Sequence, residues 1–263
     1  MNFKPQILQK RLLFRAPFLL VLFGNLWIWR IFSTNFLVGL AATFSSFFLY
    51  KSIRTQKVEN LLIVFLLILF ISQFKNTKIF PLTYLNEQER VIQLQRLNEH
   101  PPVKLSLGSK IIWIPTAHWL EGRREILIIY RIQENLKNVL SPNLYFFANH
   151  PNERVGIKEY DKFPYILFPF FVIGLLNLKF RKNISLGILF LAPIILVAIL
   201  GDKVDTEPVS LFPFMTITCV NGIEYAQGNI SKLKSPNLKK AVISIFILIY
   251  VLVLAQTAYY NFS

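Results

Sequence analysis

The sequence NLLIVFLLILFISQF at residues 60–74 runs almost directly into NTKIFPLTYLNEQER at residues 76–90. The first stretch is apolar over nearly the length of a membrane span. The second opens a polar segment, residues 76–163, that has the composition of a water-soluble fold. Strongly apolar blocks lie on both sides, over residues 16–74 and 164–262. The sequence therefore predicts a membrane protein that displays one soluble module.

The overall composition supports this interpretation. Of the 263 residues, 54% are hydrophobic and 16% are charged, whereas soluble domains carry about 25% charged residues. The apolar residues occur in blocks and not at helical or strand spacing, as expected where the surrounding solvent is lipid. The single cysteine, Cys219, excludes an internal disulfide and lies in an apolar run, where we expect a small buried side chain.

Seven apolar runs are predicted to form membrane-spanning helices. They are residues 16–32, 36–50, 60–74, 164–180, 184–201, 209–226 and 241–259. Several approach the lower limit of the roughly 17 to 25 residues that a span needs. The sixth is the weakest, because Asn221 and Glu224 lie in its second half. The predicted fold is an all-α polytopic membrane protein with about seven transmembrane helices and one mainly helical module between the third and fourth spans.

The distribution of the net charge of +15 predicts the orientation in the membrane. Lys and Arg gather at the amino terminus and near residues 51–57, 179–182 and 232–240, whereas all but two of the 14 acids fall in the module or at residues 202–207. Cytoplasmic segments carry the excess of Lys and Arg. We therefore expect a cytoplasmic amino terminus and an extracytoplasmic carboxyl terminus, in a bacterial-type plasma membrane. Basic clusters at helix ends also favour the lipid bilayer over nucleic acid as the partner.

This topology divides the chain into three parts. Residues 1–75 form an amino-terminal membrane region with three spans, residues 76–163 an extracytoplasmic module, and residues 164–263 a carboxyl-terminal membrane region with four spans. Trp27 and Trp29 are expected to anchor the first span at the membrane interface.

Two amphipathic helices are predicted within the module. Asn86 and Glu89 have the spacing of a capping box, and the helix that follows ends at Pro101. A segment with Trp113 comes next, at a position suited to the headgroup level. The second helix is expected over residues 121–140, with an apolar face formed by Ile126, Ile129, Tyr130, Leu136 and Leu140.

The candidate functional residues also lie in the module. The sequence NHPNER at residues 149–154 places His150 and Arg154 beside a turn. A titratable histidine and an arginine that binds oxyanions through two hydrogen bonds are residue types that hold a phosphate or a sugar acid. The predicted anionic headgroup site consists of His118, Arg123, Arg124, His150 and Arg154.

The alternative is a solvated turn in which Arg154 and Lys158 pair with neighbouring acids. Catalysis on the outer side would require an acid, and the candidates are Glu121, Glu153, Glu159, Asp202 and Asp205. No two histidines have metal-ligand spacing and no nucleophile motif is present, so we predict neither a metal nor a cofactor. Glu224 is either a functional intramembrane carboxylate or the marker of a helix end at the headgroups, and we favour the second interpretation.

The path ENLKNVLSPNLYFF at residues 134–147, then FPYILFPF at 163–170 and LFPF at 211–214, resembles the later half of bacterial integral-membrane glycosyltransferases of the protein-mannosyltransferase and aminoarabinose-transferase type. The resemblance covers roughly residues 121–226. It implies a truncated relative or partner subunit that works on polyprenyl-linked sugars. That family places an acid in its first extracytoplasmic loop, which residues 29–35 lack, so no catalytic residue is carried over.

Three classes of function remain open. We favour a cell-envelope membrane protein, non-catalytic on its own, whose module binds a partner or an anionic glycolipid headgroup. The alternatives are a subunit of a polyprenyl-phosphate-sugar-dependent glycosyltransferase and a transporter component. A transporter is the less favoured of these, because its helices usually carry paired charges or breaks at the membrane midplane.

Overall fold

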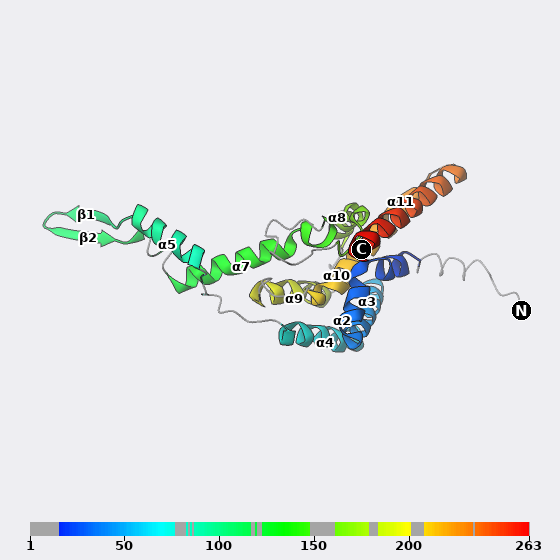
Figure 1. Cartoon of the computed structure of the whole chain (residues 1–263), viewed down its shortest axis with the longest axis horizontal. Helices are drawn as coiled ribbons and strands as arrows, with labels where there is room; N and C mark the ends of the chain where they lie inside the picture. Colours follow the sequence, from blue (N-terminus) through cyan, green and yellow to red (C-terminus); the bar gives the residue numbers. More distant parts are fainter. Residues whose placement is uncertain are drawn as a thin grey trace, which may run out of the picture.

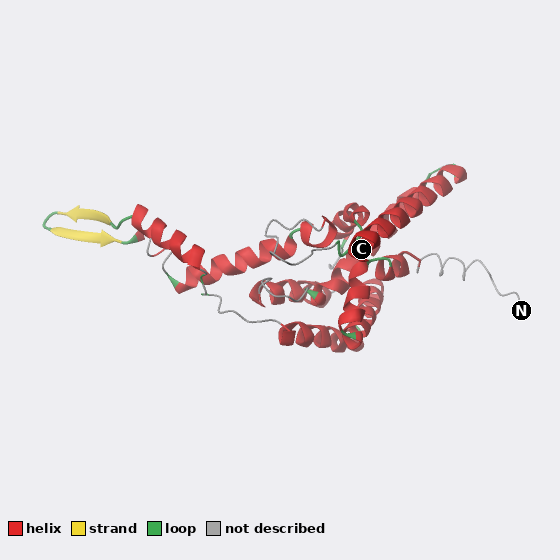
Figure 2. Cartoon of the chain, viewed as in Figure 1, coloured by secondary structure: helices red, strands yellow, loops and turns green. Residues whose placement is uncertain are grey.

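The computed structural model describes residues 16–76, 83, 85, 87–116, 119, 123–147, 161–178, 184–200, 208–233 and 235–262. Helices account for most of these residues and gather in a bundle at one end of the molecule (Figure 2). From this bundle a long helix leads to a thin projection that ends in a β-hairpin (Figure 1). The predominantly helical fold is confirmed, and the hairpin is the exception to it.

The elements follow one another along the chain as helices with one hairpin. A helix over Ala16–Phe23 precedes α2 (Leu26–Thr34), α3 (Phe36–Thr55), α4 (Asn60–Asn76), α5 (Glu87–Glu99), β1 (Val103–Leu107), β2 (Lys110–Ile114), α7 (Arg124–Leu140), α8 (Phe168–Asn177), α9 (Ile184–Leu200), α10 (Phe212–Ile230) and α11 (Pro236–Phe262). Short helical turns occur at η1 (Asn143–Phe147), η2 (Tyr165–Leu167) and η3 (Val209–Leu211).

Two helices in the described part of the chain, α3 and α11, are long and apolar enough to cross a membrane. The helix Ala16–Phe23 and α2 form a third candidate if they count as one span, although a bend of 56° separates them. The helices α4, α8 and α9 are apolar but shorter. The 10 residues of α8 extend about 15 Å, roughly half of the hydrocarbon thickness. The expected count of seven crossings is therefore not supported, whereas association with a membrane is.

The sixth apolar run forms the most enclosed helix of the bundle. α10 lies against α3 and α8, and its preceding turn η3 lies against α4. Thr216, Thr218 and Cys219 in α10 are buried. Because protein covers this helix, it can carry small and polar residues that a lipid-facing helix avoids. The feature that made this run the weakest predicted span, its polar content, instead fits its place in the interior.

The backbones of α8 and α10 touch at two glycines. A Cβ atom added at Gly174 would lie 1.8 Å from the carbonyl oxygen of Thr218, and one added at Gly222 would lie 1.8 Å from that of Phe170. Neither carbonyl can move without moving its helix. The amide of Asn221 donates a hydrogen bond of 3.3 Å to the Gly174 carbonyl across the same contact. Small residues and interhelical hydrogen bonds of this kind join helices within membranes.

One buried side chain forms hydrogen bonds with the backbone groups at the bend before α2. Asn25 donates through Nδ2 to the carbonyl oxygens of Val21 and Leu22, at 2.7 and 2.9 Å. Its Oδ1 accepts from the backbone N–H of Ile28 at 2.9 Å. Asn25 thus completes the end of one helix and the start of the next, where backbone groups otherwise lack partners. The first predicted span is a broken helix for this reason.

Trp27 is not an interfacial anchor. Its side chain is fully buried, and its ring lies 5.8 Å from that of Tyr145, 5.7 Å from Phe163 and 5.3 Å from Phe212. The expected role for Trp27 is wrong because this part of α2 faces the rest of the bundle. Trp29, by contrast, is 55% exposed, as an anchor requires.

Candidate binding surface

Three of the five residues predicted to form the headgroup site, His118, His150 and Arg154, lie outside the described residues. The candidate acids Glu121, Glu153, Glu159, Asp202 and Asp205 lie outside them as well. Arg123 is exposed, and its guanidinium carbon lies 5.8 Å from the centre of the Trp119 ring. Arg124 begins α7. The convergence of these residues on one site, and the division of the chain into three parts, stay predictions.

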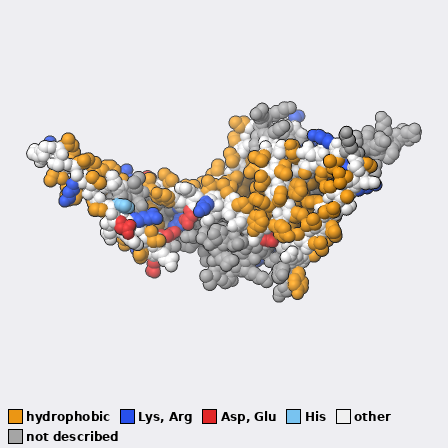
Figure 3. Space-filling view, turned by 90° about the horizontal axis from the view of Figure 1, so that it is seen from above, with side chains coloured by type: hydrophobic (Ala, Val, Ile, Leu, Met, Phe, Trp, Pro, Cys, Tyr) orange, Lys and Arg blue, Asp and Glu red, His pale blue; other side chains and the backbone are white. Residues whose placement is uncertain are grey.

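The projection seen in Figure 1, which we call the arm, consists of α5 and the hairpin, residues 87–114. Within the described structure, none of the α5 side chains is buried. The apolar face predicted for this helix is present in sequence but uncovered, since Val91, Ile92 and Leu94 expose at least half of their surface. Figure 3 shows hydrophobic, basic and acidic side chains together along the arm, beside the more uniformly hydrophobic surface of the bundle.

The hairpin was not predicted from the sequence, although its signals are present. In the stretch VKLSLGSKIIWI, Gly108 and Ser109 separate two five-residue strands. Gly108 has a φ of 62°, a left-handed value that glycine adopts readily and that the first central position of a tight hairpin turn requires. The strands pair in antiparallel register, with Val103 opposite Ile114 and Leu105 opposite Ile112.

The two faces of the hairpin differ in character. Residues directly opposite each other share a face, and successive residues alternate. The first face, which we call the apolar face, carries Val103, Leu105, Leu107, Ile112 and Ile114, with Lys110 at the turn. The second carries Lys104, Ser106, Ile111 and Trp113. On this second face the ammonium of Lys104 lies 4.4 Å from the centre of the Trp113 ring, a cation–π contact.

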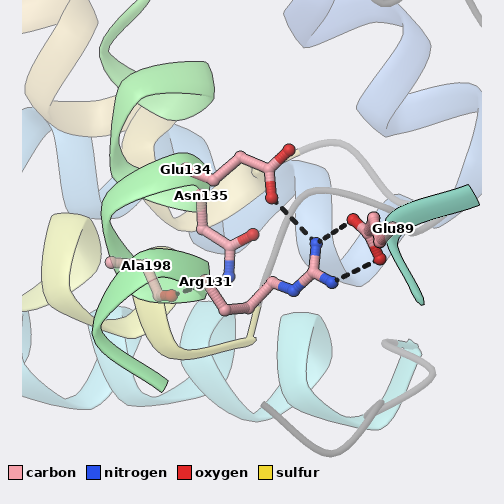
Figure 4. Close-up of polar contacts among 5 residues, drawn as sticks. All are labelled: Glu89, Arg131, Glu134, Asn135 and Ala198. Carbon is pink, nitrogen blue, oxygen red and sulfur yellow. Dashed lines mark hydrogen bonds and ion pairs between the residues drawn. The ribbon is translucent and has the colours of Figure 1, made fainter. Parts of the chain in front are cut away.

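An arginine joins the arm to α7 (Figure 4). Arg131 donates to both carboxylate oxygens of Glu89, at 3.1 and 3.0 Å, and to Glu134 at 2.8 Å. The Arg131 side chain is 12% exposed. The hydrogen bonds to Glu89 raise the pKa of Arg131 above its ordinary value, so the guanidinium stays charged at any physiological pH. A paired guanidinium and carboxylate fix orientation as well as distance.

One turn further along α7, Asn135 joins this cluster to the bundle. Its side chain is buried and donates at 2.9 Å to the carbonyl oxygen of Ala198 in the last turn of α9 (Figure 4). Carbonyl groups in a last helical turn have no partner within the helix. Through Arg131 and Asn135, α7 is therefore held to α5 on one side and to α9 on the other.

The apolar face predicted for the α7 helix is in part wrong. The helix begins at Arg124, and its buried stripe consists of Asn135, Asn138 and Val139. Ile129, Tyr130 and Leu140 are more than half exposed. Ile126 and Leu136 are partly buried, and the buried side of α7 combines the apolar Val139 with Asn135, which hydrogen-bonds α9. The exposed apolar residues extend the uncovered surface from the arm toward the bundle.

A second set of polar contacts lies just before η2 and α8. Lys162 is buried and donates through Nζ to the carbonyl oxygen of Leu144 at 3.0 Å. The Lys162 carbonyl accepts from the backbone N–H of Trp27 at 3.3 Å. Burial raises the pKa of the neighbouring Asp161 above its ordinary value, and the Lys162 charge opposes this shift. These contacts tie the end of the module to α2.

The carboxylate of Glu224 does not mark an exposed helix end. It accepts a hydrogen bond from the Tyr50 hydroxyl at 2.8 Å and forms an ion pair with Arg54, both in α3. The Glu224 side chain is 11% exposed, whereas that of Arg54 is 46% exposed. α10 continues to Ile230 beyond this point. Sequence analysis missed the partnership because Arg54 is separated from Glu224 by most of the chain.

Comparison of the chain with protein-family models, with curated proteins and with solved structures finds no match. The resemblance to membrane glycosyltransferases therefore stays a prediction. What can be said about function depends on the geometry of the chain itself.

Proposed function

We propose that this chain is a multi-pass membrane protein of the cell envelope whose arm binds another component of that envelope. Helices α3 and α11 provide the apolar segments that a membrane anchor needs. The basic residues gather in the connections between apolar helices and the acidic residues gather in the module and at residues 202–207. This distribution supports an orientation with the arm outside and the basic connections in the cytoplasm.

The observation that carries this proposal is the uncovered apolar surface of the arm. Exposed fractions of 45 to 66% occur in the hairpin at Leu105, Leu107, Ile111, Ile112 and Trp113. An isolated two-stranded hairpin is at best marginally stable in water. Contiguous exposed apolar surface of this kind marks interaction sites in soluble modules. A covering component would both bury these side chains and stabilise the strands.

The attachment of the arm also supports a binding role. The contacts from Glu89 through Arg131 to Asn135 hold α5, α7 and α9 in a defined arrangement. An arm that is fixed in advance loses less conformational freedom on binding than a flexible one.

Site-specific photocrosslinking in cells tests this proposal. A photoreactive phenylalanine at Ile112, which lies on the apolar face and is 45% exposed, is expected to form adducts with a protein or a lipid, because we propose that a bound component covers this side chain. The control has the photoreactive phenylalanine in place of Ser231, which is exposed beyond the end of α10. This control is expected to give far fewer adducts.

A second control shows that the chemistry works. Ile245 is exposed on α11, so a photoreactive residue there should form lipid adducts. Adducts from Ile245 together with none from Ile112 would contradict a binding role for the arm.

A further inference from the structure

We infer that the apolar face of the hairpin docks on an anionic lipid surface. This inference rests on the proposed function and names the component that the arm binds. The apolar face consists of Val103, Leu105, Leu107, Ile112 and Ile114, with Lys110 beside the turn. Its width of two strands suits a shallow position among headgroups and the first part of the acyl chains.

The positive charges of the hairpin favour binding to a negatively charged surface. From His100 to Leu120 the sequence contains Lys104 and Lys110 and no acidic residue. Arg123 and Arg124 follow within a few residues. Glu99, at the end of α5, and Glu121 flank this stretch in sequence, so the hairpin itself carries only positive charge. Each lysine near an anionic bilayer strengthens its attraction about fivefold, so the two lysines together contribute a factor of about 25.

The arrangement of side chains on the hairpin fits a membrane interface better than a protein partner. The face opposite the apolar one carries Lys104, Ser106, Trp113 and a single aliphatic residue, Ile111. When the apolar face contacts lipid, this second face points toward headgroups and water. Tryptophan and lysine are favoured at that level because each combines an apolar body with a polar end.

A bilayer is also always within reach of the arm. The module is joined to apolar helices at both ends, through α4 and α8. Tethering makes docking on lipid an intramolecular event with a high effective concentration. A shallow contact of modest intrinsic affinity is then sufficient to keep the hairpin covered.

The test compares neighbouring residues on opposite faces in the full chain. Leu105→Cys and Ser106→Cys variants, each with Cys219→Ser, are labelled with an environment-sensitive dye. They are reconstituted at low protein-to-lipid ratio into vesicles of phosphatidylcholine, with or without one-third phosphatidylglycerol. We expect brominated lipid to quench the dye at residue 105 in the anionic vesicles and to quench the dye at residue 106 much less.

Charge variants give a second, independent measurement. The ratio of quenched to unquenched dye at residue 105 is measured as the fraction of phosphatidylglycerol is increased. At a given fraction, this ratio should be about 25-fold lower in the variant with both Lys104→Gln and Lys110→Gln than in the protein with both lysines. Lys57 and Lys240 are exposed outside the arm, and Lys57→Gln with Lys240→Gln should leave this ratio unchanged.

Three results would overturn the inference. They are equal quenching at residues 105 and 106, equal quenching with and without phosphatidylglycerol, and no effect of the arm lysines. If the dye stays in water in both vesicles while a photoreactive residue at Ile112 crosslinks to a protein in cells, the lipid assignment fails and the binding role of the arm stands. If the residue at Ile112 also forms no adduct, both fail.

Discussion

A single methyl group added at Gly222 is expected to lower the thermal midpoint of the protein by roughly 6 to 12 °C. The Cβ atom of Gly222→Ala would lie 1.8 Å from the Phe170 carbonyl oxygen, so α8 and α10 must separate. Overpacking costs about 1 to 3 kcal/mol. We expect the upper end because the obstacle is backbone and not a flexible side chain. About 3 kcal/mol corresponds to this shift in a chain of comparable size.

The native thiol provides the measurement. Cys219 is the single cysteine of the chain, is buried in α10, and lies one turn from Gly222. A dye that fluoresces on reaction with thiols will report when heating exposes it. Gly228→Ala is the matched control, because it changes the same helix where nothing beyond the neighbouring turns of that helix lies within 4 Å of the added Cβ. It should leave the midpoint unchanged or raise it slightly, since alanine favours helix over glycine. Equal midpoints for the two variants would show that α8 and α10 do not touch here.

Removal of Arg54 is expected to cost about 2 to 3 kcal/mol of stability. Arg54→Gln leaves the Glu224 carboxylate, 11% exposed, with the Tyr50 hydroxyl but without its opposite charge. Breaking a fully buried pair costs about 3 to 5 kcal/mol. We expect less here because Arg54 is 46% exposed and water can replace part of the interaction. The same thermal measurement with Cys219 gives the loss.

A double variant separates the ion pair from other effects. Arg54→Gln with Glu224→Gln removes both charges and should be more stable than Arg54→Gln alone, with a coupling of about 1 to 2 kcal/mol. The pair between Lys51 and Glu59, at 2.9 Å and with both side chains about one-third to one-half exposed, is the comparison within the same region. Lys51→Gln should cost less than about 1 kcal/mol. Equal losses for Lys51→Gln and Arg54→Gln would contradict the importance of burial at Glu224.

The sequence predicted the helical class and the place of the arm's first helix, because both depend on local signals. The capping spacing near Glu89 and the prolines after Glu99 bound α5 closely. The alternation of apolar and polar residues before Gly108 is a local signal for a strand that the prediction of a mainly helical module left out. These features need no knowledge of long-range contacts.

The errors share one physical cause, which is that burial depends on partners far away in the sequence. Trp27 is a residue type that is typical of interfacial anchors, yet its ring packs against Tyr145 and Phe212. Glu224 has the appearance of a helix end until Arg54 is placed beside it. Asn135 is a polar residue that is buried in α7 with its side chain hydrogen-bonded to Ala198. Apolar content alone therefore overestimated the number of lipid-facing helices.

We propose that the membrane-embedded bundle holds the arm outside the cell and the end of α10 inside. Labelling with a membrane-impermeant maleimide tests it most directly, at Asn98→Cys on the arm and at Ser231→Cys just after α10, both exposed positions. The buried Cys219 should not react in the folded protein. We predict that Asn98→Cys is labelled on intact cells and Ser231→Cys only after the membrane is made permeable. Labelling of both from the same side, or of Asn98→Cys only after permeabilisation, would contradict the account.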